Sequence, residues 1–298
     1  MVRDKSISSK ILDIFVYLVM FVVLIITLYP VLHIFASSLS GRIANETGAV
    51  TIFPIDFTVE AYQMIWNAGT VPNAFLNSVQ YTAVGVTINM LVTTSFAYAL
   101  SRKHLPLRGL YTIIAIIPMY FSGGLVPTFM LVNNLGLTNS MWALVLPSAM
   151  SITNFIIMRT FFQNLPAELE ESAKLDGAND FTIFVRIVLP LSKAVLYTIG
   201  LFYTVAHWNS WFPAMIYLRD SDLFPLQLVL RQVVILAEDI REAAISGDFA
   251  AGEAFIAGVN VIAIRYAILC VAILPMLLIY PFVQRHFIKG VMIGSLKG

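Results

Sequence analysis

The most charged stretch of the chain covers residues 164–181, with the sequence NLPAELEESAKLDGANDF. Its three glutamates, Glu168, Glu170 and Glu171, fall in the first turns of a predicted helix, where they favour the positive end of the helix dipole. Asn164 is the predicted N-cap, Pro166 stands near the first helical position, and Gly177 is placed to end the helix in a left-handed conformation. Asp180 is predicted to cap a second helix. A short helix–turn–helix of this kind is typical of an element that docks in a groove of a soluble protein.

The predicted first helix of this stretch has two different faces. Leu165, Leu169 and Ala173 recur at four-residue spacing and give it one apolar stripe. We expect Glu168 and Glu170 to form only a solvated face of the helix. The stretch therefore favours recognition of a partner by an amphipathic helix.

Residues that bind metals or act as nucleophiles are scattered through the chain. The four histidines, His33, His104, His207 and His286, have no ligand spacing, and Cys270 is the single cysteine. We therefore predict no metal site, and an intrachain disulfide is excluded. No paired catalytic groups stand out in the apolar stretches, which argues against an intramembrane enzyme. The chain also lacks a phosphate-binding glycine loop of its own.

The composition favours lipid as the solvent of most of the chain. Hydrophobic residues make up 59% of the 298 residues and charged residues 12%, and the mean hydropathy is +0.83. A soluble domain is about half apolar and about a quarter charged. Because one soluble core cannot hide so much apolar surface, we expect an integral membrane protein. The net charge of +1 gives no reason to expect nucleic acid as a partner.

Six apolar stretches are long enough to cross a bilayer as helices of about 20 residues. They cover residues 11–36, 75–100, 110–132, 141–162, 187–206 and 262–282. Prolines interrupt several of them, and neighbouring helices can satisfy the backbone groups that such kinks free. The first stretch is too long for a typical signal peptide, so we expect a retained helix. The predicted fold is all-α with six transmembrane helices.

Lysine and arginine, which favour the cytoplasmic side, predict the orientation of these helices. They gather at the N-terminus, after the second and the fourth stretch, and at the C-terminus. These four segments alternate as six spans with both ends inside require. The charged stretch 164–181 is therefore expected in the cytoplasm, and the long segment 219–261 on the outer side.

The charged stretch and the residues after it carry a resemblance to a known family. Glu171-Ser-Ala-Lys-Leu-Asp-Gly177, then nine residues, then Ile187-Val-Leu-Pro190 resembles the cytoplasmic "EAA" loop of binding-protein-dependent ABC importer permeases. Ser172 replaces the first of the two alanines of that motif. In the family this loop is the coupling helix that docks into the ATPase subunit. The resemblance implies that coupling is carried here by Glu171, Ala173, Asp176, Gly177, Ile187, Leu189 and Pro190.

Further segments resemble the sugar-importing branch of these permeases. Among them are residues 57–62, 77–78, 97–102 and 208–211, while the tail 289–298 is similar to maltose-type permeases of the second-subunit kind. The tail and the segment 219–261 look most like the LplC-like polysaccharide-uptake group. The resemblance implies the type I importer permease fold, called MetI-like. It divides the chain into an N-terminal part with the first helix and an outer loop (1–74), a permease core (75–287) with the coupling loop 164–186, and a cytoplasmic tail (288–298).

The resemblance also implies partners. A second homologous permease, expected to form a heterodimer with this chain, would complete the pathway, and two ATPase subunits would bind the coupling helices. An extracellular or periplasmic solute-binding protein would deliver the sugar to a bacterial cytoplasmic membrane. The subunit itself is expected to be non-catalytic and without cofactors, because ATP and Mg²⁺ would bind the ATPase subunits. In the family the tail can reach between those subunits, so we expect contacts from Gly294, Lys297 and Gly298.

A sugar pathway needs polar and aromatic side chains that face a cavity, since such groups are costly inside a bilayer otherwise. The candidates are Asn77, Gln80, Asn89, Asn154, Tyr203, Trp208, Asn209 and Trp211. Two plainer interpretations stay open: tryptophans at membrane boundaries form aromatic belts, and single asparagines bond neighbouring helices. Arg265 is expected to reach the outer interface with its charged end.

Two alternative functions remain. The coupling loop alone does not exclude an ABC importer of a non-sugar solute, such as an amino acid, phosphate or a polyamine. A secondary transporter driven by an ion gradient is disfavoured, because the predicted spans contain almost no aspartate or glutamate and no internal repeat is visible.

Overall fold

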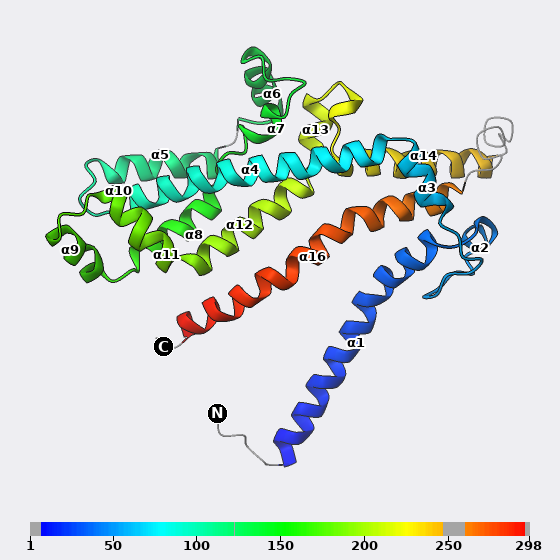
Figure 1. The fold of residues 1–298 in the computed structure, drawn as a ribbon, viewed down its shortest axis with the longest axis horizontal. Helices are drawn as coiled ribbons and strands as arrows, with labels where there is room; N and C mark the ends of the chain where they lie inside the picture. Colours follow the sequence, from blue (N-terminus) through cyan, green and yellow to red (C-terminus); the bar gives the residue numbers. More distant parts are fainter. Residues whose placement is uncertain (1–6, 122, 247–259, 296–298) are drawn as a thin grey trace. The chain divides into compact units, whose positions relative to one another are not determined.

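The computed structural model describes residues 7–121, 123–246 and 260–295, all of them in helices or connecting loops (Figure 1). The chain divides into two compact units. The first unit comprises Met1–Val71 and Leu230–Ile273, and the second comprises Pro72–Val229 and Leu274–Gly298. The all-helical prediction is confirmed for the described residues.

The first unit is built around the long helix α1 (Ile7–Ser38). It also contains α2 (Arg42–Glu46), α3 (Glu60–Asn67), most of α14 (Leu226–Ser246) and the first part of α16 (Val261–Ser295). The apolar window of α1 has a mean hydropathy of 2.9, and none of it is buried within the chain. A helix that is apolar all round and uncovered by its own chain needs lipid or another protein around it.

Polar contacts join the C-terminal end of α1 to α2, to α3 and to the first part of α16. The Ser38 hydroxyl bonds the Tyr62 hydroxyl at 2.9 Å, and the Cys270 thiol donates to Ser38 Oγ at 3.6 Å. Asn45 donates to the Ser37 carbonyl, and Asn260 donates to the Ser40 carbonyl. Each of these groups has a partner, which keeps the cost of burying polar atoms low.

The second unit holds the remaining helices. They are α4 (Thr70–Ser101), α5 (Arg108–Tyr120), α6 (Leu125–Asn134), α7 (Trp142–Val145), α8 (Ile152–Gln163), α9 (Ala167–Leu175), α10 (Asp180–Ile183), α11 (Leu189–Leu191), α12 (Lys193–Trp208) and α13 (Phe212–Tyr217). A π-helical turn (Phe184–Val188) precedes α11, and a 3₁₀ turn (Ser221–Leu223) precedes α14. The main core packs side chains of α4, α5, α8 and α12, among them the fully buried Phe155, Met158 and Ile199.

Three described helices are long and apolar enough to cross a membrane alone: Ser9–Ser38 within α1, α4, and Val261–Ile279 within α16. They coincide with the first, second and sixth predicted stretches. The third and fifth stretches each correspond to a broken pair of helices. Between α5 and α6 the break includes Gly124 at φ +82°, and between α11 and α12 the chain turns by 83° at Ser192. Pro190 has no N–H for the helical ladder, which accounts for irregular backbone at this second break.

The fourth predicted stretch, 141–162, is not one continuous helix. Residues 146–151 separate α7 from α8, and Pro147 lies in this break. Ser151 is the N-cap of α8, because its hydroxyl accepts the Asn154 N–H. Pro147 has no N–H to donate, and Ser151 caps a new helix. For these two reasons the apolar stretch forms two helices and not one. The sequence predicted a proline kink within one span, and the structure shows two separate helices at this place instead.

Candidate functional site

Helix α9 lies in the charged stretch, and it starts later than the sequence suggested. Its N-cap is Pro166, and Asn164 instead ends α8 as its C-cap. The residue before a proline is pushed toward extended backbone, so Leu165 separates the two helices. The predicted capping role of Asn164 was therefore wrong.

The turn after α9 follows the predicted geometry. Gly177 has φ +82°, its N–H donates to the Lys174 carbonyl at 3.0 Å, and the Ala178 N–H donates to the Ala173 carbonyl at 2.9 Å. This pair of bonds is the Schellman arrangement, which satisfies carbonyls at a helix end. The prediction that Gly177 stops the helix is confirmed.

Helix α10 is capped one residue earlier than predicted. The Asn179 side chain accepts the Thr182 N–H at 2.8 Å, which makes Asn179 the N-cap and Asp180 the first helical residue. The Asp180 carboxylate lies 3.3 Å from Lys174 Nζ, so an ion pair connects α9 with α10. Both groups are about half exposed, and such a pair contributes roughly 0–1 kcal/mol.

One acidic residue of α9 turns toward α4 of the same chain. Glu170 forms an ion pair with Arg102, and the two side chains are only 14% and 12% exposed. The expectation that Glu170 belongs to a solvated face was wrong, whereas Glu168 and Glu171 are exposed. Sequence reasoning missed the pair because its partner stands 68 residues away.

Arg102 makes several further contacts at the end of α4. Its Nη2 donates to the Phe162 carbonyl and its Nε donates to Ser101 Oγ, at 3.0 and 2.9 Å. The guanidinium lies 4.7 Å from the centre of the Tyr98 ring, within the range of a cation–π contact. Burial lowers the pKa of Arg102 from its ordinary value, and the nearby Tyr98 and Asp180 act in the opposite direction.

The solvent-facing surface of the α9–α10 element is exposed and partly apolar. None of the residues of α9, all of which the structure describes, is buried. Leu175 is 90% exposed and Phe181 is 73% exposed, on either side of the Gly177 turn. Two large apolar side chains at the tip of a charged loop are what a docking surface presents to a protein partner.

The remaining predicted coupling residues lie close to this element or at the chain's end. Ile187 belongs to the π-helical turn, and Leu189 and Pro190 belong to α11, which together lead into α12. Figure 1 shows α9, α10 and α11 gathered at one end of the second unit. Gly294 lies within α16, whereas Lys297 and Gly298 lie outside the described residues.

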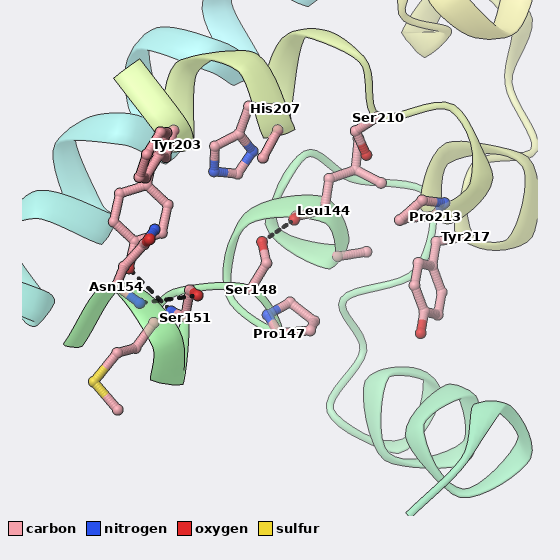
Figure 2. Close-up of a pocket in the computed structure, with 14 residues that line it drawn as sticks. Leu144, Pro147, Ser148, Ser151, Asn154, Tyr203, His207, Ser210, Pro213 and Tyr217 are labelled. Carbon is pink, nitrogen blue, oxygen red and sulfur yellow. Dashed lines mark hydrogen bonds between the residues drawn. The ribbon is translucent and has the colours of Figure 1, made fainter. Parts of the chain in front are cut away.

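A cavity of about 380 Å³ opens in the second unit between the α7–α8 break, α12 and α13 (Figure 2). Of the predicted pathway residues, Asn154 and Tyr203 line it. The Tyr203 hydroxyl bonds Thr93 Oγ1 at 2.7 Å and accepts the Ser151 N–H at 3.0 Å. Tyr203 thereby fixes the start of α8 beside the cavity.

His207 also lines the cavity, although sequence reasoning found no role for it. Asn89 stands behind it, fully buried: its Nδ2 donates to the Ser148 carbonyl, and its Oδ1 bonds His207 Nε2. Because that oxygen can only accept, His207 Nε2 carries a proton. Asn89 therefore joins α4, α12 and the α7–α8 break. The isolated position of His207 in the sequence gave no signal that could have revealed it.

The other predicted pathway residues lie away from the cavity lining. Asn77 donates to the Asp222 and Phe224 carbonyls, and Gln80 contacts Met141 Sδ at 3.8 Å. Asn209 donates to the Val205 carbonyl within its own helix. The ring of Trp208, 3% exposed, packs edge-on against Phe75, and the ring of Trp211 packs against Phe212.

Comparison with known proteins places the whole chain among transport components. Residues 90–293 match the family described as "Binding-protein-dependent transport system inner membrane component". The polygalacturonan/rhamnogalacturonan transport system permease protein YtcP of Bacillus subtilis is 38% identical, over 98% of this chain and 100% of its own length. Protein LplC of the same organism is 42% identical, over 92% of this chain and 90% of its own.

A solved structure has the same fold over almost the whole chain. It is the crystal structure of a bacterial ABC transporter involved in the import of the acidic polysaccharide alginate. The two chains are 29% identical with a TM-score of 0.83, and the match covers 95% of this chain and 99% of the other.

Proposed function

Because this chain belongs to the family of binding-protein-dependent transport system inner membrane components, we propose that it is one permease subunit of an ATP-driven sugar importer. It crosses the bacterial cytoplasmic membrane six times with both ends in the cytoplasm. A second, homologous permease completes the pathway as a heterodimer. Two ATPase subunits and an extracellular or periplasmic solute-binding protein complete the assembly.

The substrate we propose is an oligosaccharide derived from a polysaccharide. Two similar proteins support this class: one belongs to a polygalacturonan/rhamnogalacturonan transport system, and the other belongs to a transporter involved in the import of alginate. Both matches extend over at least 95% of this chain, so they include the helices that line the cavity. The outer segment 219–261 has no assigned role within this proposal.

The exposed α9–α10 element is the observation that carries the coupling role. It is closed by Gly177 in a left-handed conformation, and it presents Leu175 and Phe181 to the solvent. We assign it to the groove of an ATPase subunit, with Glu171, Ala173 and Asp176 on the docking helix. When the α9–α10 element is displaced, the segment that contains Ile187, Leu189 and Pro190 transmits this displacement to α12. The tail residues Gly294, Lys297 and Gly298 are proposed to touch the ATPase subunits.

ATP and Mg²⁺ bind the ATPase subunits, so this chain contributes movement and a passage. When ATP draws the ATPase subunits together, each coupling element moves with its groove as a rigid body. The helices attached to it then change from an inward-facing to an outward-facing arrangement. A short helix with fixed ends suits this role, because a frayed helix would absorb the displacement.

The cavity of the second unit is the part of this chain that we assign to the sugar passage. Its described lining offers the hydroxyls of Ser148, Ser151 and Tyr203 and the amide of Asn154. Hydroxyls and amides exchange hydrogen bonds with sugar hydroxyls, and the Tyr217 ring supplies an apolar face for a sugar ring. Asn89 supports this lining from behind.

The test is ATP hydrolysis by the purified assembly in lipid, with its solute-binding protein and a panel of neutral and acidic oligosaccharides. Stimulation by one class of oligosaccharide supports both the importer and the substrate class. A response to amino acids, phosphate or polyamines instead would keep the importer and overturn the sugar assignment. A response to an ion gradient without hydrolysis would favour a secondary transporter.

A further inference from the structure

We propose that Arg102, through its ion pair with Glu170, is the positioning residue that transmits the movement of the coupling element directly into α4. This inference rests on the proposed function. The covalent connections of the element lead only to α8 and to α12, which precede and follow it in the chain. The Arg102–Glu170 pair adds a third connection, to a helix that is distant in the sequence.

The contacts of Arg102 form a junction of three elements. Its guanidinium reaches Glu170 on α9, the Phe162 carbonyl near the end of α8, and Ser101 at the end of α4. Each bond uses a different nitrogen, Nη1, Nη2 or Nε. The planar fork of an arginine can hold several acceptors in fixed directions at once, which the ammonium of a lysine cannot.

Tyr98, one turn before Arg102 on α4, contacts the second half of the coupling element. Its hydroxyl donates to the Asp180 carbonyl at 3.3 Å, and its ring stacks on Phe184 with centroids 4.8 Å apart. The Arg102 guanidinium covers the same ring. The last turn of α4 is therefore attached to α9 through Arg102 and to the start of α10 through Tyr98.

Two neighbouring glutamates of α9 thus have different partners. Glu170 faces the permease itself and is largely covered, whereas Glu171 is exposed and free to face another protein. Successive residues of a helix point about 100° apart, so one helix serves both directions. Glu171 belongs to the ATPase-facing side and Glu170 to the α4-facing side.

The burial of the pair indicates why it transmits force well. Exposed ion pairs are weak and mobile, but both side chains here are less than 15% exposed, and removal of one partner leaves a covered charge without compensation. Movement of α9 away from α4 is opposed for the same reason. The two elements are therefore expected to move together.

The test measures sugar transported and ATP hydrolysed in parallel, in proteoliposomes that contain the complete assembly and its binding protein. Arg102→Gln and Glu170→Gln should each lower the sugar transported per ATP by about tenfold, within the usual range of coupling between sites. ATP hydrolysis and binding of the ATPase subunits should persist. The charge-swapped double variant Arg102→Glu with Glu170→Arg should recover part of the ratio, because it restores the ion pair but not the bonds from residue 102 to the Phe162 carbonyl and Ser101.

Glu168→Gln is the matched control, because Glu168 lies on the same helix and is exposed; it should leave the ratio unchanged. Loss of ATPase binding in Glu170→Gln would overturn the proposal, since Glu170 would then belong to the ATPase-facing side. An unchanged ratio in both single variants would also overturn it. A double variant that assembles but keeps the low ratio of the single variants would overturn it as well, because opposite charges at these two positions would then not carry the coupling. If the unaltered assembly transports no sugar, the proposed function fails instead.

Discussion

The imidazole of His207 occupies the space where a side chain at Gly85 would stand. A Cβ atom placed on Gly85 would lie 2.5 Å from His207 Nε2 and 2.6 Å from Cε1. Helices α4 and α12 therefore touch at this point through a bare backbone and a ring. Asn89, one turn along α4, fixes that ring by its hydrogen bond to Nε2. The wall of the cavity beside His207 depends on the absence of a side chain at residue 85.

The substitution Gly85→Ala should therefore destabilise the protein, although alanine is a better helix former. The ring of His207 cannot retreat without losing its bond to Asn89, and overpacking of this kind costs roughly 1–3 kcal/mol. Gly200→Ala is the matched control, since its Cβ would meet only Met90 Sδ, at an ordinary 3.9 Å. Thermal unfolding in detergent should show a lower midpoint for the first variant alone. Equal midpoints would contradict the close contact.

Gly177→Val should uncouple hydrolysis from transport. At φ +82° a β-branched residue is strained, by roughly 1–2 kcal/mol, so α9 and α10 would lose their mutual orientation. Gly177→Asn should be tolerated, because asparagine accepts left-handed backbone more readily. Sugar uptake and ATP hydrolysis in proteoliposomes distinguish the variants. Normal uptake by the valine variant would count against a coupling role of this turn.

Leu175→Asp should weaken binding of the ATPase subunits without unfolding the permease. Leu175 is 90% exposed within this chain, so the substitution removes no contact of the permease itself. It places a charge where we expect an apolar anchor, which typically costs a complex 2 kcal/mol or more, about a 30-fold loss of affinity. The measurement is the amount of ATPase subunit that copurifies with the chain.

Leu135→Asp is the control for that substitution, since Leu135 is also exposed, at 62%, and follows α6 away from the coupling element. Its ATPase content should match that of the unaltered chain. Equal loss in both variants would point to a general effect on the membrane subunit. If both variants retain the ATPase subunits, Leu175 is not part of the docking surface.

Tyr203→Phe removes a single oxygen atom and should disturb the lining of the cavity. The lost hydroxyl leaves the Ser151 N–H and the Thr93 hydroxyl without their observed partner, and an unsatisfied buried group costs roughly 1–3 kcal/mol. We expect slower sugar uptake and a lower unfolding midpoint. Tyr120→Phe, at a tyrosine that is 74% exposed, should change neither. Normal sugar uptake by the Tyr203→Phe variant would show that the tyrosine hydroxyl has no role in the sugar passage.

The features predictable from the sequence are local ones. The left-handed turn at Gly177 and the long apolar helices α1, α4 and α16 depend on residues close in the chain, so short patterns indicate them. Prolines were expected to kink the apolar stretches, whereas the fourth stretch divides around Pro147 into α7 and α8, with Ser151 as the N-cap of the second helix.

The missed features depend on contacts between distant residues. Glu170 differs from Glu168 only because Arg102 reaches it from the end of α4, and His207 acquires a role only because α4 brings Gly85 and Asn89 against it. The residues near each partner in the sequence do not indicate either contact. Pathway candidates such as Asn77 were chosen for polarity alone, whereas the structure shows its amide bonded to backbone carbonyls.

The central claim, that this chain is a permease driven through α9 and α10, is tested most directly by copurification with ATPase subunits from membranes. The full chain should retain those subunits in a stable complex, and deletion of residues 171–177 should release them while the helices remain in the membrane. A full chain that associates with no ATPase subunit would contradict the claim, and so would a deletion variant that binds them as well as the full chain.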